Sequence, residues 1–222
     1  PPRSTPLYSS AASDVYKRQP LDEDRPLVSK KNAPPYDKTK AAAQRLVYDA
    51  CDSGLDATIL HPTGIIGPFD FKPSRMGKVL LDIMTRKMLI NINAGFNWVD
   101  VRDVSEAAIN CITLGKQGQH YIIPGQWATF EQISTMISNQ LHLRTNLVTL
   151  PFWSAYLALP FAFLFSQLTG NRPSFSRGSL HALAEQCQNI PGDLAKKEIG
   201  HSPRPLVETI NDTITWFKKN AS

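Results

Sequence analysis

A tyrosine and a lysine four positions apart, Tyr36 and Lys40, have the spacing that places two side chains on one face of a helix, one turn apart. The alanine-rich run at 41–47 favours a helix, and the prolines at 34–35 stand where the first turn of a helix tolerates them. A free tyrosine has a pKa of about 10, but a nearby ammonium favours the phenolate. Tyr36 beside Lys40 could therefore serve as a general acid or base. The same spacing also suits a solvated helix face, so spacing alone does not identify a site.

Further motifs follow this pair in a fixed order. They are HPTGIIGP at 61–68, FNWVDVRDV at 96–104, and HSPRPL at 201–206 with TITWF at 213–217. Together with Tyr-x-x-x-Lys they resemble the extended short-chain dehydrogenase/reductase superfamily, in its active-site helix, the strand end and loop behind that helix, its "FVDVRDV" segment and its C-terminal helix. The closest resemblance is to its dihydroflavonol-reductase-like and NAD-dependent epimerase/dehydratase families. It extends from about residue 20 to the end of the chain.

The resemblance implies an α/β fold, the C-terminal remnant of a Rossmann-like doubly wound parallel sheet with a mostly helical substrate-binding cap. It implies an enzyme that uses NAD or NADP and couples proton transfer to hydride transfer at the carbonyl or alcohol carbon of a small molecule. Tyr36 would carry the proton, and Lys40 would favour the phenolate and hold the nicotinamide ribose. Reduction, oxidation, epimerisation and dehydration all stay open.

The loop at 61–68 follows a short apolar strand predicted at 57–60, and ligands of open parallel sheets lie at the carboxyl ends of strands. The resemblance implies that Pro62, Thr63 and Ile65 lie on the cofactor side of this loop. The alternative is a plain exit from a strand, kept irregular by glycines and a proline at 64–68. His61 stands where the family commonly has arginine and receives no role.

Three regions are expected along the chain. Residues 1–19 resemble one reading frame of a transposon-based sequencing adapter, and we expect them to be non-native and disordered. Within them, Ser9-Ser10 could suggest the family's catalytic serine, but no apolar β-branched run precedes it. Residues 20–125 would form the C-terminal part of the dinucleotide-binding domain with cap insertions. Residues 126–222 would form a mostly helical substrate-binding region.

The sequence has no match to the family's Gly-x-x-Gly-x-x-Gly turn, which sets a pyrophosphate on a helix N-terminus. We therefore expect a C-terminal fragment that is inactive alone. Two other classes remain open, a non-catalytic NAD(P)-sensing protein and a membrane-surface sterol or lipid dehydrogenase.

Between Arg144 and Arg172 the chain carries no charged residue, a length close to that of a bilayer span. Pro160 interrupts this stretch, which favours apolar helices of a substrate cap over a spanning helix. An apolar substrate and a contact with a membrane surface are both compatible with it.

Composition narrows the remaining classes. Hydrophobic residues make up 42% and charged residues 19% of the chain, as in a globular protein. Three separated cysteines and scattered histidines suggest neither disulfides nor a metal site, and a reducing, cytoplasmic setting is expected. The net charge of +5 comes without a basic run longer than two residues, so no nucleic-acid surface is expected. The oligomeric state stays open.

Local signals predict further elements. A helix from Tyr36 should end near Gly54, and a helix at 130–141 should have Thr129 as its N-cap. Asp103 and Glu106 have capping-box spacing, so Asp103 reads as a cap rather than a catalytic acid. The buried stripe of the last helix would be Leu206, Val207, Ile210, Ile214 and Phe217. Two further side chains could face substrate, which the sequence does not decide: Asn97 and Arg102.

Overall fold

The computed structural model describes residues 20–27, 35–88, 90–143, 148–160, 180, 183–184 and 186–220. The expectation of disorder for residues 1–19 lies outside the described residues, as does about half of the uncharged stretch expected to form the cap. Within the described ranges, no helix is both long enough and apolar enough to cross a bilayer.

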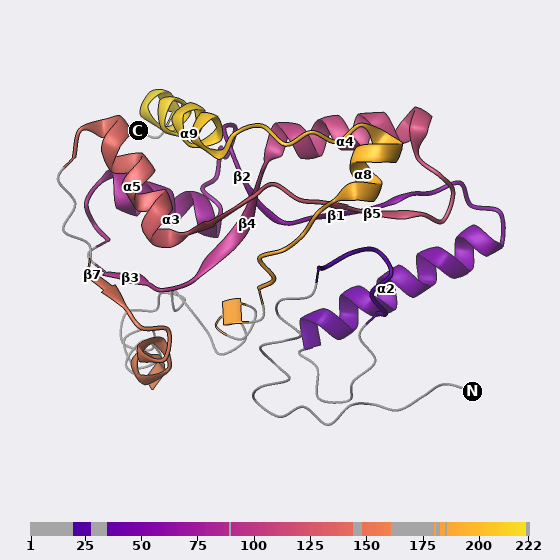
Figure 1. Ribbon diagram of the computed structural model, residues 1–222, viewed down its shortest axis with the longest axis horizontal. Helices are drawn as coiled ribbons and strands as arrows, with labels where there is room; N and C mark the ends of the chain where they lie inside the picture. The colour runs from indigo at the N-terminus through magenta and orange to yellow at the C-terminus, as the bar shows by residue number, and fades with distance from the viewer. Residues whose placement is uncertain are drawn as a thin grey trace.

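The strands are short and pair mostly in parallel (Figure 1). They are β1 (Ile59–Pro62), β2 (Gly64–Ile66), β3 (Ile90–Ile92), β4 (Gly95–Asp100), β5 (His120–Ile123), β6 (Gln126–Thr129) and β7 (Val148–Leu150). β1 pairs in parallel with β5, β2 with β4 and β3 with β7, whereas β4 and β6 are antiparallel. Because parallel neighbours need crossover connections, helices separate these strands along the chain. The expected mixed α/β class is confirmed.

Two paired strands separate at one point, which we call the fork and define as residues 62–64 and 123–125. β1 and β5 run side by side as far as Pro62 and Ile123. Beyond these two residues, the chain continues from β1 into β2 and from β5 into β6. Strand β4 lies between β2 and β6 in their sheet. Gly125 passes so close to β4 that an added Cβ would lie 1.7 Å from the carbonyl oxygen of Trp98. Only glycine allows this approach of two backbones.

The helices are amphipathic and enclose two apolar clusters. They are α2 (Pro35–Asp52), α3 (Arg75–Met84), α4 (Val101–Leu114), α5 (Phe130–Leu141), α8 (Asp193–Ile199) and α9 (Leu206–Asn220). One cluster joins α3, α5 and α9 to β2, β4 and β6, and the other joins α4 and α8 to β4 and β5. In Figure 1, α4 and α8 lie along one side of the β1–β5 pair and α2 lies along the other.

Predictions based on local signals are confirmed for two helices. Thr129 caps α5 through a complete capping box with Gln132, whose side chain bonds back to the Thr129 backbone. α2 ends at Asp52, and Gly54 follows with a φ of 101°, a left-handed conformation that glycine adopts without strain.

Other predictions were wrong. The N-cap of α4 is Asp100, which accepts from the Arg102 backbone, and Asp103 lies inside the first turn. The segment at 64–68 is not wholly irregular, because β2 pairs its first three residues with β4. Val207, expected in the buried stripe of the last helix, is exposed, because the residue after the buried Leu206 points to another side of α9. Thr209 and Thr213 complete the buried face instead.

Candidate functional site

The predicted catalytic pair lies at the N-terminal end of α2. The Lys40 Nζ is 5.7 Å from the centroid of the Tyr36 ring, within the range of a cation–π contact. Tyr36 is 70% exposed and Lys40 is also exposed, whereas Ala41, Gln44 and Cys51 form the buried side of the helix. The structure therefore brings the phenol and the ammonium together on an accessible face.

The predicted cofactor-side residues lie at the fork or next to it. Pro62 ends β1 and is exposed, and Ile65, in β2, is 42% exposed. Thr63 lies between the two strands, where its backbone N–H donates to the Ile123 carbonyl at 3.2 Å. The hydroxyl of Thr63 donates to Asn97 Oδ1 at 3.0 Å. The two donors of Thr63 are thus committed within the protein, while Pro62 and Ile65 offer apolar surface.

Asn97 fastens the two sides of the fork. Its side chain is buried, with 4% of the residue exposed. Its Oδ1 accepts from the Thr63 hydroxyl and, at 2.6 Å, from the Gly125 backbone N–H. Sequence reasoning left open whether Asn97 faces substrate, and the structure gives it these structural bonds. Only the polar residue within an otherwise aromatic run, Phe96-Asn97-Trp98, could have signalled a buried amide.

Arg102, the other residue considered for substrate, is engaged in ion pairs. Its guanidinium contacts the Asp100 carboxylate at 2.7 Å and the Asp212 carboxylate at 2.7 Å. Burial raises the pKa of Asp100, but hydrogen bonds from the Arg102 side chain and backbone outweigh it and hold that pKa below its usual value. Nearby, Asp103 accepts from Arg204 Nε at 2.6 Å. These bonds connect the start of α4 to α9 and to the segment before α9.

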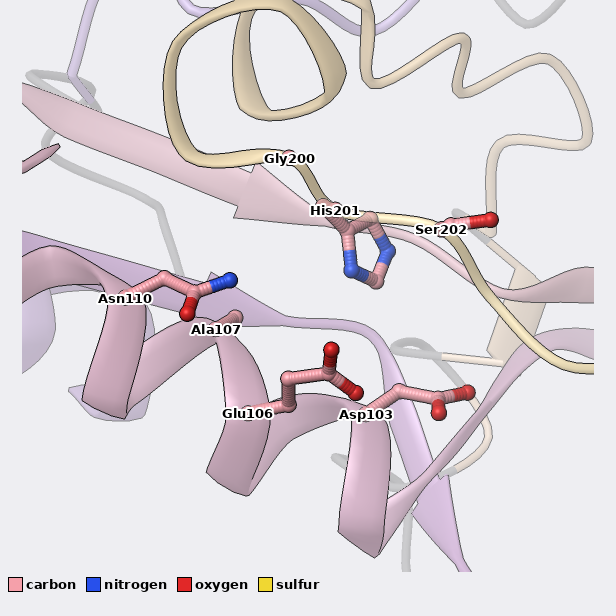
Figure 2. Close-up of a pocket in the computed structure, with 7 residues that line it drawn as sticks. All are labelled: Asp103, Glu106, Ala107, Asn110, Gly200, His201 and Ser202. Atoms are coloured by element: carbon pink, nitrogen blue, oxygen red, sulfur yellow. The ribbon is translucent and has the colours of Figure 1, made fainter.

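A small polar pocket lies elsewhere, between α4 and the turn after α8. Figure 2 shows Asp103, Glu106 and Asn110 on the helix side and His201 on the turn. Most of these groups are engaged: Asn110 donates to the Ile199 carbonyl at 3.0 Å, and His201 Nε2 donates to the Pro124 carbonyl at 2.7 Å. The polar groups around this pocket therefore hold α4 against the turn after α8. The residues that line the pocket include none of the predicted site residues.

The chain matches the NAD dependent epimerase/dehydratase family over residues 4–123. It is 28% identical over 186 residues to sterol demethylase protein B of Methylococcus capsulatus, covering 83% of this chain and 56% of that protein. It is 27% identical over 192 residues to a putative dihydroflavonol 4-reductase of Synechocystis, covering 83% of this chain and 55% of that protein. The chain thus spans about half the length of these relatives.

Solved structures agree with this fold. The protein gox2253 superposes with a TM-score of 0.73 at 28% identity, covering 90% of this chain and 61% of that one. A nucleoside-diphosphate-sugar epimerase from Pseudomonas aeruginosa gives a TM-score of 0.69 at 20% identity, with coverages of 91% and 61%. The dTDP-glucose 4,6-dehydratase of Bacillus anthracis, solved in complex with NAD, gives 0.67 at 16% identity, with coverages of 94% and 60%. At such identities the last two support the Rossmann-like fold alone.

Proposed function

Because the chain belongs to the NAD dependent epimerase/dehydratase family, we propose that it carries the proton-transfer pair of an NAD(P)-dependent oxidoreductase or epimerase. The contact of Lys40 with the Tyr36 ring, on the exposed end of α2, is the observation that supports this most directly. The substrate is a small molecule with a reactive carbonyl or alcohol carbon.

Tyr36 is the acid and base of this proposal. When a carbonyl is reduced its oxygen gains negative charge, and a phenol within hydrogen-bond reach supplies the proton. In the reverse direction the phenolate removes the proton from the alcohol. The Lys40 ammonium stabilises the phenolate in both directions, because an opposite charge nearby favours the ionised form.

The described residues fit the nicotinamide end of NAD or NADP. Pro62 and Ile65 present exposed apolar surface against which a flat ring can pack, and the Lys40 ammonium has N–H donors for ribose hydroxyls. Thr63 can only accept there, because its hydroxyl and backbone hydrogens are already donated. The bound cofactor would accept or supply the hydride, and the side chains of this chain would hold and move the proton.

The other end of the cofactor lacks its usual cradle, because no Gly-x-x-Gly-x-x-Gly turn occurs in the 222 residues. We infer that this polypeptide alone binds the cofactor weakly and is inactive. Titration with NADH or NADPH, followed by cofactor fluorescence, should show no binding at micromolar concentrations. Saturation-transfer NMR should mark the nicotinamide and its ribose more strongly than the adenine. Micromolar binding would contradict the weak-binding inference, and a lack of transfer to the nicotinamide would contradict the site.

The catalytic roles are tested in an active protein that contains these residues. Tyr36→Phe should lower kcat by about 10²- to 10⁴-fold, the usual contribution of a general acid or base. Lys40→Met should lower kcat and weaken cofactor binding together. Lys38→Met is the matched control, because Lys38 lies on the same helix but two positions from Tyr36, on another face. Full activity in Tyr36→Phe would rule out the proposed role.

A second candidate function concerns membranes or apolar substrates. Val148 of β7 and the nearby Trp153 and Leu157 are large apolar residues that are more than half exposed. Such residues suit a lipid surface or an apolar ligand better than water. Cosedimentation with anionic liposomes tests this: binding that Trp153→Ser and Leu157→Ser abolish would support a membrane-surface protein, and absence of binding would exclude one.

A further inference from the structure

Four polar side chains form a row along α2 at four-residue intervals. Tyr36, Lys40, Gln44 and Tyr48 follow one another by one helical turn each. The first two are exposed, whereas Gln44 is buried and donates from Nε2 to the Tyr48 Oη at 2.6 Å. The row leads from the proposed catalytic end of the helix toward the β1–β5 pair.

The row ends on a histidine of β5. Tyr48 Oη lies 2.7 Å from His120 Nδ1, and His120 Nε2 lies 3.0 Å from the Glu23 carbonyl oxygen. A carbonyl oxygen only accepts, so Nε2 carries the hydrogen of this bond. In a neutral imidazole the other nitrogen is then an acceptor, and the Tyr48 hydroxyl donates to it. The donors thus run in one direction, from Gln44 through Tyr48 and His120 to Glu23.

A second histidine lies against the first. The rings of His61 and His120 have centroids 5.6 Å apart and meet edge to face. His61 immediately precedes Pro62 at the fork, and burial followed by repulsion from His120 lowers the pKa of His61, with Glu23 acting in the opposite direction. The Glu23 carboxylate also accepts from the Ile122 backbone N–H at 2.8 Å. Within the part of the chain that the structure describes, the polar and titratable groups that face the His120 ring are Tyr48 of α2, His61 of β1 and Glu23, and Gln44 contacts Tyr48 behind them.

We propose that His120 is a positioning residue, which through Tyr48 holds α2, and with it Tyr36 and Lys40, in place relative to the fork. The hydrogen-bond chain also makes the direction of this tether depend on protonation of His120. The link to catalysis rests on the proposed function, whereas the direction of the tether does not.

Protonation of His120 would reverse the direction of its hydrogen bond with Tyr48. Both nitrogens of an imidazolium are donors, so His120 Nδ1 would donate to the Tyr48 oxygen, which already accepts from Gln44. The phenol hydrogen must then turn away from His120, and the Gln44 Nε2 on its other side is itself a donor. A second charge next to His61 is also unfavourable. The donor order from Gln44 to Glu23 therefore belongs to neutral His120, and acidification should reverse the Tyr48–His120 bond and shift the signals of the C-terminal half of α2.

The direction of the tether can be read by NMR on the ¹⁵N-histidine-labelled 222-residue chain. At neutral pH the ring shifts of His120 should show hydrogen on Nε2 and none on Nδ1, and the α2 amide signals should move on acidification together with the His120 ring. Hydrogen on Nδ1 at neutral pH would overturn the inference. So would α2 amide signals that do not change together with the His120 ring signals on acidification.

Two variants separate the two ends of the imidazole. The amide of His120→Asn reaches the place of Nδ1 and can still accept from Tyr48, whereas that of His120→Gln reaches the place of Nε2 and can serve only the Glu23 carbonyl. Neither side chain titrates. We expect wild-type α2 signals in His120→Asn, and the same displaced signals in His120→Gln and Tyr48→Phe. If His120→Gln fails to fold, the α2 signals of Tyr48→Phe still show the effect of losing the Tyr48–His120 bond. Equal displacements of the α2 signals in His120→Asn and His120→Gln would overturn the proposal.

Catalysis supplies the last readout. In an active protein that contains these residues, His120→Gln should lower kcat by about ten- to a hundredfold, as small misplacements of catalytic groups do. His120→Asn should keep the wild-type kcat, because its amide can still accept from Tyr48. If Tyr36→Phe keeps full activity, the proposed function fails while the NMR result stands. If the NMR result fails and Tyr36→Phe is inactive, only the positioning role is lost.

Discussion

Removing the amide that fastens the fork should destabilise the protein far more than removing one of its two partners. Asn97→Ala leaves the Gly125 N–H without its acceptor at 2.6 Å, and an unsatisfied backbone donor costs about 1–3 kcal/mol. The Thr63 hydroxyl loses a bond worth about 1 kcal/mol, although the Ile123 carbonyl at 3.4 Å remains within its reach. We expect a loss of about 3 kcal/mol in the free energy of unfolding.

Two comparisons make this prediction specific. Thr63→Val removes the hydroxyl but leaves the bond to Gly125, so it should cost only about 1 kcal/mol. Asn110→Ala is the matched asparagine control, because among the described residues the Asn110 side chain bonds to the Ile199 carbonyl alone, and it should also cost about 1 kcal/mol. Urea denaturation followed by circular dichroism measures all three. If Asn97→Ala costs no more than Asn110→Ala, Asn97 does not fasten the fork.

The remaining predictions concern pH. Burial, followed by the hydrogen bond from its hydroxyl to Glu198 at 2.7 Å, raises the pKa of Tyr121 to about 12. The contribution of the protonated Tyr121 to the free energy of unfolding is complete below pH 10 and is lost as the pH rises toward 12. At 1.36 kcal/mol per pH unit the loss is about 3 kcal/mol. Unfolding curves of the wild type and Tyr121→Phe at alkaline pH measure this loss, and identical pH dependences would contradict the prediction. The pKa of Asp100 is lowered in the folded state by Arg102, so its contribution is present above about pH 4 and falls away in stronger acid. Asp100→Asn should flatten the acid limb of the stability curve, and an unchanged limb would refute the assignment.

Elements that depend on neighbours in sequence were predictable. α5 carries its capping box within four residues, and α2 combines alanines with a terminal glycine. The family motifs likewise indicated the α/β class. These signals are local, so one sequence contains all the information that they need.

Features that depend on distant partners were not predictable. β2 and β6 are three and four residues long, and only their pairing with β4 makes them strands. Asn97 accepts from residues 34 and 28 positions away, and Asp103 binds an arginine 101 positions away. The side chain of Asp103 matched a cap locally, but its real partner approaches through tertiary folding. The roles of Tyr36 and Lys40 stay predictions.

The fork also limits how the chain can change in length. A single residue, Thr63, separates β1, in register with β5, from β2, in register with β4. Because side chains alternate along a strand, one inserted residue at this junction would turn the buried Ile66 outward while leaving β1 unaltered. Deleting a residue at this junction would likewise break the register of one of the two pairings, β1 with β5 or β2 with β4. Homologous chains should therefore vary in length at surface turns and keep a one-residue junction here, and a family member with a longer junction would need a bulge to restore both registers.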